Sequence, residues 1–390
     1  MIVSVKTLAV VTGTRAEYGL LYPVLKQAFA DPELDVRLLV TGAHLRPEYG
    51  NTVEAIEKDG FPIAERFDIL RFGNSADSVT QSTALAMQLF GSWFAAHPVD
   101  ACLVLGDRYE IFAAAAAAAF QKVPVVHISG GDVTEGAQDD WIRHCITKMA
   151  ALHFPYCEAY RQRLLRMGEE PCRVFNVGAL GAENIRTLPL LSRAALGEKF
   201  DFDFTKPYLL ITYHPETLAA ISPSEQLRRF LAALQRMPEI GLCITGANAD
   251  AGGSEINALW QAFTAERPNA KLFASMGLVG YLSAMKYCSA VAGNSSSGVV
   301  ETPEMQVPCV NIGDRQKGRM RCENVIDCPC ETQEIYAALQ QAISPEFTAR
   351  AAAASSPFYR PDTAGQMLRI LKRSADSGLL RRPKSFYDGE

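Results

Sequence analysis

The sequence predicts an α/β fold made of two successive halves, each a parallel sheet covered by helices. Short apolar runs alternate with longer stretches of helical periodicity, which is the pattern of βαβ units. The pattern breaks near residue 184 and restarts near residue 208. Several runs end in polar residues, and in open parallel sheets ligands bind beyond the carboxyl ends of the strands. We therefore expect functional residues at these strand ends in both halves.

Four strands are expected in the first half, at residues 7–11, 36–40, 101–105 and 123–128, because each is a compact apolar run. A helical pattern follows the first strand over residues 17–29. The alanine tract at 113–119 predicts a tightly packed helix, since alanine is the best helix former.

The second half repeats this organisation after a polar stretch at 184–206, which we interpret as a linker. Strands are expected at residues 208–212, 241–245, 290–292 and 308–312, and a helix at 299–306. The sequence thus predicts an N-terminal domain at 1–185 and a C-terminal domain at 186–355. A helical pattern near 363–371 suggests that residues 356–390 pack back on the N-terminal domain.

Composition excludes several classes of protein. The 390 residues are 48% apolar, enough for sizeable cores, and the net charge of −5 argues against a broad nucleic-acid or anionic-membrane surface. No apolar stretch reaches the length of a membrane span, and the first residues lack the features of a signal peptide. We expect a cytoplasmic protein with reduced cysteines. The spacing of Cys328 and Cys330 is too close for an ordinary zinc pair, so no metal site is expected there.

The loop that follows the run at 290–292 is the most informative segment. It reads Gly-Asn-Ser-Ser-Ser-Gly over residues 293–298, with Glu301 shortly after. Backbone N–H groups and serine hydroxyls after a strand form a seat for a phosphate, and a carboxylate at Glu301 suits a ribose diol. The alternative is an ordinary helix capped by a serine.

Two other strand ends carry candidate residues in the first half. Arg15 follows Gly13 and Thr14, where a guanidinium suits a phosphate or a uracil edge, although a surface arginine in a turn has the same pattern. Asp107 and Arg108 follow the run at 101–105. A carboxylate there suits acid/base catalysis, but from these residues alone a helix cap is the better interpretation.

Residues 127–144 are dense in titratable groups. Four carboxylates, two histidines and one arginine fall in this stretch: Asp132, Glu135, Asp139, Asp140, His127, His144 and Arg143. Carboxylates held close together shift one another's pKa and divide acid and base roles. The alternative is a solvated acidic loop in which Asp139 or Asp140 caps a helix. The flanking Gly-Gly pair and histidine favour a functional role.

Two further candidates lie in the second half. His214, in the block His-Pro-Glu-Thr at 214–217, could protonate or stabilise a leaving phosphate, although a lone histidine is more often structural. The stretch 313–321 holds Arg315, Lys317, Arg319 and Arg321, which suggests a local grip on an anion or, by composition alone, a solvated loop.

Together these motifs resemble the hydrolysing UDP-N-acetylglucosamine 2-epimerases of bacterial sialic-acid biosynthesis. Several blocks in order are more specific than any one of them. The blocks are Gly-Thr-Arg-Ala-Glu-Tyr-Gly at 13–19, Gly-Asp-Arg-Tyr-Glu-Ile-Phe at 106–112, Ile-Arg-His-Cys-Ile-Thr-Lys-Met at 142–149, Gly-Ala-Glu-Asn at 181–184, His-Pro-Glu-Thr at 214–217, Gly-Asn-Ser-Ser-Ser-Gly at 293–298 and Asn-Ile-Gly-Asp-Arg-Gln-Lys-Gly-Arg at 311–319.

The resemblance implies two Rossmann-like domains facing across a cleft, as in the glycosyltransferase-B arrangement. It implies a homo-oligomer, a dimer or tetramer, that needs neither metal nor other cofactor. It also implies the reaction: anti elimination of UDP from a UDP-sugar to give 2-acetamidoglucal, followed by addition of water with inversion at C2. The products would be UDP and N-acetylmannosamine.

The resemblance also assigns roles to residues. Asp107, Asp132, Asp139 and His214 would be catalytic, with His214 assisting the leaving diphosphate and Arg143 orienting Asp107 and Asp139. UDP and the sugar would be bound by Arg15, Arg108, Arg143, His144, Ser295, Ser296, Ser297, Gly298, Glu301, Arg315 and Arg319. Of these, Arg15 would contact the uridine diphosphate, the serines the phosphates and Glu301 the ribose.

One departure from the related enzymes concerns the Gly-Gly block. There it is preceded by Glu or His and followed by Glu, whereas here the positions hold Ser129 and Asp132. A serine is no base at neutral pH without activation, and Asp132 is one methylene shorter than Glu. Either Asp132 is the third acid/base group or Asp107 and Asp139 suffice.

Three rival functions share much of this pattern. The same reaction could act on another UDP-sugar, such as UDP-N,N'-diacetylbacillosamine on the way to legionaminic acid. A glycosyltransferase of the same architecture would need an acceptor and leave C2 untouched. A nucleotide-sugar sensor would need no catalytic carboxylates, which hinder diphosphate binding.

Overall fold

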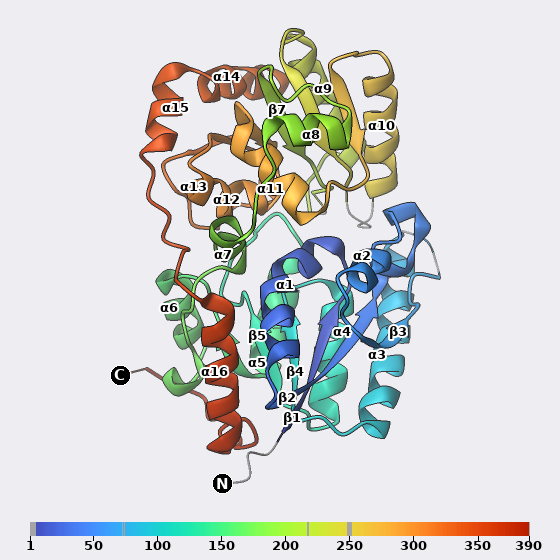
Figure 1. Cartoon of the computed structure of the whole chain (residues 1–390), viewed down its shortest axis with the longest axis vertical. Coiled ribbons are helices and arrows are strands. Elements are labelled where there is room, and N and C mark those ends of the chain that lie inside the picture. The colour runs from blue at the N-terminus through green and yellow to red at the C-terminus, as the bar shows by residue number, and fades with distance from the viewer. Residues whose placement is uncertain (1–4, 72, 74, 217, 248–251, 390) are drawn as a thin grey trace. The chain divides into compact units, whose positions relative to one another are not determined.

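The computed structural model describes residues 5–71, 73, 75–216, 218–247 and 252–389 (Figure 1). Residues 1–4 and Thr217 of the His-Pro-Glu-Thr block lie outside the described residues. The chain divides into two compact units. Unit 1 comprises Met1–Asp132, Asp139–Asn184 and Phe358–Glu390, and unit 2 comprises Val133–Gln138 and Ile185–Pro357.

Unit 1 is built on a six-stranded parallel sheet in the order β3-β2-β1-β4-β5-β6. Its central strands are buried on both faces, which is why they appear in the sequence as continuous apolar runs. The strands are β1 (Lys6–Thr12), β2 (Leu34–Thr41), β3 (Ile63–Phe67), β4 (Ala101–Leu105), β5 (Val125–Ile128) and β6 (Ala150–Phe154).

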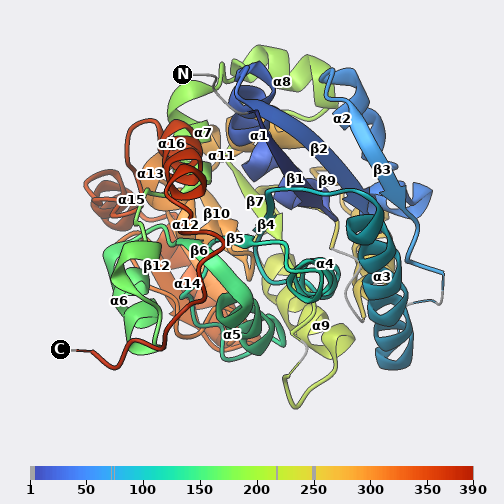
Figure 2. The same ribbon diagram turned by 90° about the horizontal axis from the view of Figure 1, so that it is seen from below.

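Helices cover both faces of this sheet. Alternate residues of β1 divide between two cores: Leu8 and Val10 pack with helices α1 and α16, whereas Ala9 and Val11 pack with α3, α4 and α5. Figure 2 shows these two groups on opposite sides of the strands. The helices of unit 1 are α1 (Arg15–Ala30), α2 (Val53–Lys58), α3 (Ala76–Ala96), α4 (Tyr109–Phe120), α5 (Asp139–Met149), α6 (Glu158–Arg166), α7 (Leu180–Thr187), which runs into unit 2, and α16 (Thr363–Asp376).

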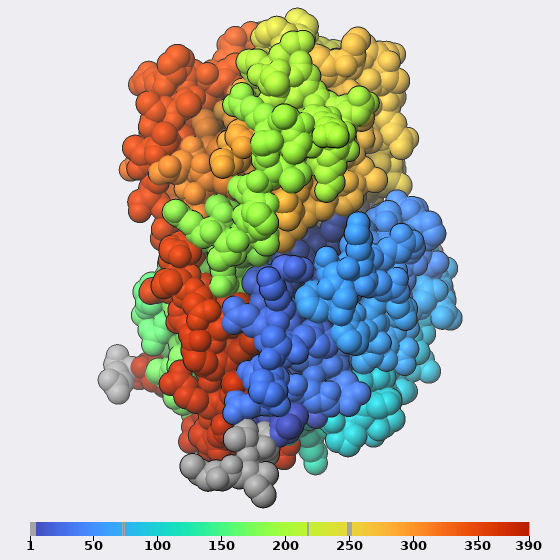
Figure 3. All heavy atoms as spheres, in the orientation of Figure 1, coloured from blue at the N-terminus to red at the C-terminus, as the bar shows by residue number. Residues whose placement is uncertain are grey.

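Helix α16 lies against α1, as Figures 1 and 3 show, although the two are separated by most of the chain. The Thr363 hydroxyl donates to the Val177 carbonyl at 2.8 Å. The Lys372 ammonium pairs with Asp31 and Glu33, both at 2.6 Å. The last segment of the chain thus completes one face of the first sheet.

Unit 2 repeats the design with a sheet in the order β12-β11-β10-β7-β8-β9, again parallel throughout. Its cores lie on either side of β7, where Leu209 and Ile211 face one and Leu210 the other. The strands are β7 (Tyr208–Thr212), β8 (Gly241–Thr245), β9 (Ala270–Phe273), β10 (Ala290–Gly293), β11 (Cys309–Ile312) and β12 (Val325–Cys328). The helices are α8 (Arg193–Phe200), α9 (Pro223–Gln235), α10 (Gly253–Ala265), α11 (Gly277–Tyr287), α12 (Ser297–Val300), α13 (Thr302–Met305), α14 (Thr332–Ala342) and α15 (Pro345–Ala352).

Two predicted elements were wrong. The supposed linker at 184–206 contains the end of α7 and the whole of α8, whose Ser192 hydroxyl caps the Ala195 N–H and whose Leu196 is buried. The single helix expected at 299–306 is instead two four-residue helices, α12 and α13. Pro303 has no N–H to continue the first of them.

Residues 133–138, placed by the sequence in the N-terminal domain, belong to unit 2. The Glu135 N–H donates to the Lys317 carbonyl at 3.0 Å, and the two side chains form an ion pair at 3.0 Å. Gly136 packs so closely on the Asp314 backbone that a Cβ would lie 2.5 Å from its carbonyl oxygen. The predicted N-terminal domain at 1–185 therefore wrongly includes this short segment, where the chain enters unit 2 and returns to unit 1.

No helix among the described residues is long and apolar enough to cross a membrane. The cysteines, including Cys328 and Cys330, are free thiols, and the described part of the chain holds no group of three or more His, Cys, Asp or Glu placed to bind a metal ion.

Candidate functional site

The end of β4 carries the carboxylate with the clearest arrangement. After Leu105 the chain turns at Gly106, whose φ of +82° favours glycine. Asp107 then accepts two hydrogen bonds from the Arg143 guanidinium, one of them from Nε at 2.7 Å. Arg108, not Asp107, occupies the N-cap position of α4. Asp107 is therefore tied to the helix that carries Arg143.

Helix α5 supplies the partners of Asp107. The Arg143 side chain is only 1% exposed, and its Nη1 also lies 3.5 Å from Asp140 Oδ1. The Asp140 carboxylate reaches His144 Nε2 at 3.6 Å. Burial lowers the pKa of His144, and the Asp140 charge opposes this shift. Arg143 thus joins Asp107 to Asp140. Asp140 and the predicted Asp139 both lie in the first turn of α5.

The Gly-Gly block follows β5. Ser129 lies in the left-handed region at φ +68°, which is costly for a residue with a side chain and typical of functional turns. Asp132 is 1% exposed and accepts a 2.6 Å hydrogen bond from the Tyr156 hydroxyl. His127 binds the Gly106 carbonyl through Nε2 at 2.9 Å, and burial lowers its pKa to about 4, so it is neutral at physiological pH. Asp132, not Ser129, presents a carboxylate here.

Arg108 lies beside a buried pair of glutamates that the sequence did not single out. The Gly13 N–H donates to Glu17 Oε2 at 2.8 Å, while Arg108 Nε lies 2.6 Å from Glu110 Oε1 and 3.9 Å from Glu17 Oε1. Burial, followed by the Glu110 charge, raises the pKa of Glu17 to about 8. Arg108 thus pairs with the buried Glu110, while Glu17 is largely protonated at physiological pH. Arg15 begins α1 and is half-buried. The only signal was the spacing, with a Glu four residues after Gly13 and another two after Arg108.

In unit 2, the ends of β7 and β10 are joined by Asn294. Its Oδ1 accepts the His214 N–H at 2.7 Å, and its Nδ2 donates to the His214 carbonyl at 2.8 Å. Just before this bridge the two strands leave no space for a side chain at Gly293. A Cβ there would lie 2.0 Å from the Thr212 carbonyl oxygen. Asn294, which sequence reasoning left without a role, therefore fixes the backbone of the predicted catalytic histidine.

The serine loop follows directly. The Ser297 hydroxyl donates to the Glu301 carboxylate, and the Ser297 N–H donates to the Ser295 hydroxyl at 3.4 Å. Gly298 is buried, and a Cβ at this position would lie only 2.9 Å from Cys309 Sγ. Burial raises the pKa of Glu301 to about 6, against the lowering effect of the Ser297 hydrogen bond. Ser295, Ser296 and Ser297 are at least partly exposed, whereas Glu301 is buried beneath them.

Glu301→Gln should stabilise the unliganded protein at neutral pH. A raised pKa in the folded state contributes stability that is complete below the unfolded value of 4.5 and lost as pH rises through about 6. Near pH 7.5 the ionised carboxylate therefore costs on the order of 2 kcal/mol, which a neutral amide avoids. Urea unfolding at pH 7.5 and pH 4.5 measures the gain, which should shrink towards zero at the lower pH.

The matched control is Glu255→Gln on an exposed helix face, which should show no such pH-dependent gain. An equal gain for Glu301→Gln at both pH values would contradict the linkage.

The residues of the basic loop after β11 make two kinds of contact. Arg315 Nη1 and Gln316 Nε2 donate to the Asn294 carbonyl at 3.1 and 2.9 Å, and the Asp314 N–H donates to Glu216 at 3.2 Å. Arg319 lies in the same loop and its carbonyl accepts from Arg321, which pairs with Asp327. The structure thus brings Arg315 to the serine loop, whereas Lys317 and Arg321 form ion pairs elsewhere.

These features define a two-domain α/β protein whose two parallel sheets carry polar and charged groups at their carboxyl ends. The chain matches the family described as UDP-N-acetylglucosamine 2-epimerase over residues 26–372, and it belongs to that family. The predicted family and the glycosyltransferase-B-like fold class of two Rossmann-like domains are confirmed.

Two relatives and one solved structure illustrate the likeness. The chain is 37% identical over 384 residues to the polysialic acid biosynthesis protein P7 of Escherichia coli, covering 98% of this chain and 97% of the relative. It is 39% identical over 345 residues to the hydrolysing GDP/UDP-N,N'-diacetylbacillosamine 2-epimerase of Campylobacter jejuni, covering 88% and 89%. The UDP-GlcNAc 2-epimerase of Neisseria meningitidis, solved with UDP-GlcNAc, shares the fold with a TM-score of 0.79 at 18% identity over 94% of this chain and 100% of that one.

Proposed function

We propose that this protein is a hydrolysing UDP-N-acetylglucosamine 2-epimerase that supplies N-acetylmannosamine for sialic-acid biosynthesis. A base removes the proton at C2 while the C1–O bond breaks and its electrons leave with UDP, giving 2-acetamidoglucal. Water then adds across the double bond, with hydroxyl to C1 and a proton to the opposite face of C2. The products are UDP and N-acetylmannosamine.

The observation that carries this proposal is the Asp107 carboxylate, held after β4 by the buried Arg143. The C2 proton of a sugar is weakly acidic, so its removal needs a positioned base. An arginine that binds one side of the carboxylate fixes its orientation. Asp132 and Asp139 are the candidates for the second acid/base role, and Tyr156 positions the first of them.

Unit 2 carries the groups suited to UDP. We assign the phosphates to the serine loop with Arg315, and the ribose hydroxyls to Glu301, the buried carboxylate beneath it. His214 would stabilise the departing diphosphate. Asn294 fixes the backbone of His214 and so helps to hold it in place. Arg15, Arg108, His144 and Arg319 complete the proposed substrate-binding set. We further propose a cytoplasmic homo-oligomer that needs no cofactor.

A second candidate substrate is UDP-N,N'-diacetylbacillosamine. It is favoured by the relative from Campylobacter jejuni, whose name gives this activity and which is 39% identical. The elimination and hydration would be the same, because the substrates share the UDP group and the reacting C1 and C2. A comparison of kcat/KM for the two UDP-sugars decides between them.

The test is proton NMR of the protein with UDP-N-acetylglucosamine in D2O, without acceptor or added metal. N-acetylmannosamine carrying deuterium at C2, with UDP released, would support the proposal. Release of N-acetylglucosamine with its C2 proton retained would point to a transferase that hydrolyses its donor. In H2(18)O the released UDP should contain no 18O, because elimination breaks the C1–O bond and not the O–P bond.

A further inference from the structure

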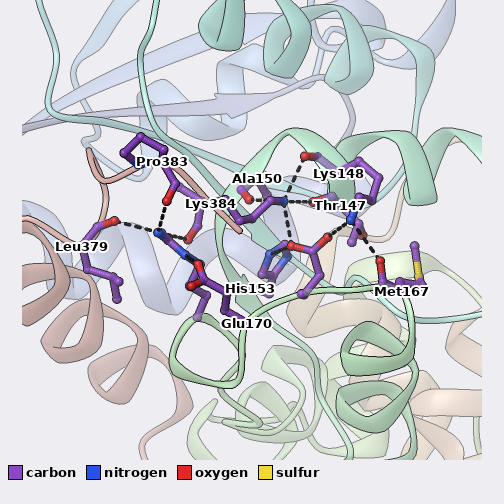
Figure 4. Close-up of polar contacts among 12 residues, drawn as sticks. Thr147, Lys148, Ala150, His153, Met167, Glu170, Leu379, Pro383 and Lys384 are labelled. Carbon is purple, nitrogen blue, oxygen red and sulfur yellow. Dashed lines mark hydrogen bonds and ion pairs between the residues drawn. The ribbon is translucent and has the colours of Figure 1, made fainter. Parts of the chain in front are cut away.

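The carboxyl end of α5 is bound by a lysine from the far end of the chain. Figure 4 shows the Lys384 ammonium among three backbone carbonyls, those of Thr147, Lys148 and Ala150, at 3.3, 2.9 and 3.0 Å. The last carbonyls of a helix have no partner within it, and a cation placed there satisfies them and suits the helix dipole. Lys384 thus does for α5 what a capping residue does for other helices.

A buried glutamate holds the same ammonium from the other side. Glu169 is fully buried, and its Oε2 lies 2.6 Å from Lys384 Nζ. Its carboxylate also meets Lys148 of α5 at 2.7 Å and His153 of β6 at 3.0 Å. A buried carboxylate with three partners is held rigidly, because the loss of any partner would leave part of its charge uncompensated in the protein interior. Lys384 is therefore fixed in place and does not merely rest on the surface.

The segment that carries Lys384 is itself anchored. The Arg173 side chain is fully buried and donates to the carbonyls of Leu379 at 2.8 Å, Arg382 at 3.0 Å and Ala151 at 3.1 Å. In Figure 4 dashed lines run to the carbonyls of Leu379 and Pro383 in this segment. Beyond Lys384, the Tyr387 N–H donates to the Gly168 carbonyl at 2.9 Å. Residues 379–387 therefore form a fixed strap along the end of α5.

We infer that Lys384 is a positioning residue for the reaction, acting through α5. The inference rests on the proposed function, since α5 carries Arg143, the partner of Asp107, together with Asp139 and Asp140 in its first turn. An eleven-residue helix is a rigid rod of roughly 16 Å, so a shift at its carboxyl end moves its whole length. Lys384 would thus hold the Arg143 guanidinium in register with the end of β4.

The test compares Lys384→Met with two matched variants. Lys384→Met keeps the length of the side chain and removes the charge, and it should lower kcat by about tenfold or more while KM changes little. Lys384→Arg, which can still donate to the carbonyls, should restore much of kcat. Lys372→Met removes a comparable lysine of the same C-terminal segment, paired with Asp31 and Glu33 and not with α5, and it should keep kcat near wild type.

Hydrogen exchange keeps the inference testable even without turnover. In Lys384→Met the amides of α5 should exchange about tenfold faster than in Lys372→Met, because the end of the helix is freed. Unchanged exchange in α5 would overturn the inference, as would equal kcat for both variants. If the wild-type protein is inactive on every UDP-sugar, the proposed function is wrong. The exchange result then still shows whether Lys384 holds α5. If Lys384→Met does not fold, Lys384→Gln takes its place with the same expectations.

Discussion

Replacement of Asp107 by Asn should reduce kcat about 10³-fold while UDP still binds. The amide has the shape of the carboxylate and can still accept a hydrogen bond from Arg143, but it cannot take a proton. UDP binding should persist because the serine loop and Glu301 belong to unit 2. Initial rates of UDP release give kcat, and titration calorimetry gives the UDP affinity.

The control for this variant lies at the opposite end of the same strand. Asp100 precedes β4, accepts a 3.0 Å hydrogen bond from the Thr7 N–H and pairs with Arg381 at 2.8 Å. Asp100→Asn makes the same chemical change beside an arginine, and it should leave kcat close to wild type. Unchanged turnover in Asp107→Asn would remove Asp107 from the mechanism, and loss of turnover in both variants would mean that the effect is structural.

Asn294→Ala should destabilise unit 2 strongly, and it should also weaken UDP binding. It leaves the buried N–H and carbonyl of His214 without their side-chain partner, at a cost of about 3 kcal/mol. The same change frees the loop that starts at residue 295, so UDP affinity should fall about tenfold or more. Thermal unfolding with and without UDP measures both effects.

Asn269→Ala is the matched control. Its amide donates to the carbonyls of Pro238 and Ile240, at 3.0 and 3.1 Å, near the amino end of β8. This variant should lose stability but keep its UDP affinity. Equal UDP affinity in Asn294→Ala and wild type would show that the bridge between β7 and β10 does not organise the loop.

The strands that the sequence predicted are the inner ones of both sheets. The strands it did not predict, β3, β6, β9 and β12, are the edge strands. Inner strands are buried on both faces and appear as apolar runs, whereas β3 exposes Glu65 and Arg66 and β12 exposes Asp327. An edge strand forms because it pairs with an inner strand, and the local sequence pattern does not show that pairing.

The candidate site shows a similar division. The positions of residues that follow an inner strand, such as Asp107 and His214, could be predicted because the strand end itself is predictable. Glu17 and Asn294 were missed because their roles depend on contacts: Glu17 binds a backbone N–H of its own turn, and Asn294 bridges two strands that are 80 residues apart. The supposed linker was wrong for the same reason, since the burial of Leu196 is a tertiary property.

The chain's return to unit 1 has a consequence for its synthesis. Residues 358–390 supply α16 and the strap that holds α5, and a ribosome makes them after all of unit 2. All parts of unit 2, including the segment 133–138 from upstream, are therefore made before unit 1 is complete. Unit 1, although it is begun first, must wait until residues 358–390 are made before the face of its sheet that α1 and α16 share is fully covered. Ribosome-bound chains stopped before residue 358 should accordingly expose that apolar face to chaperones.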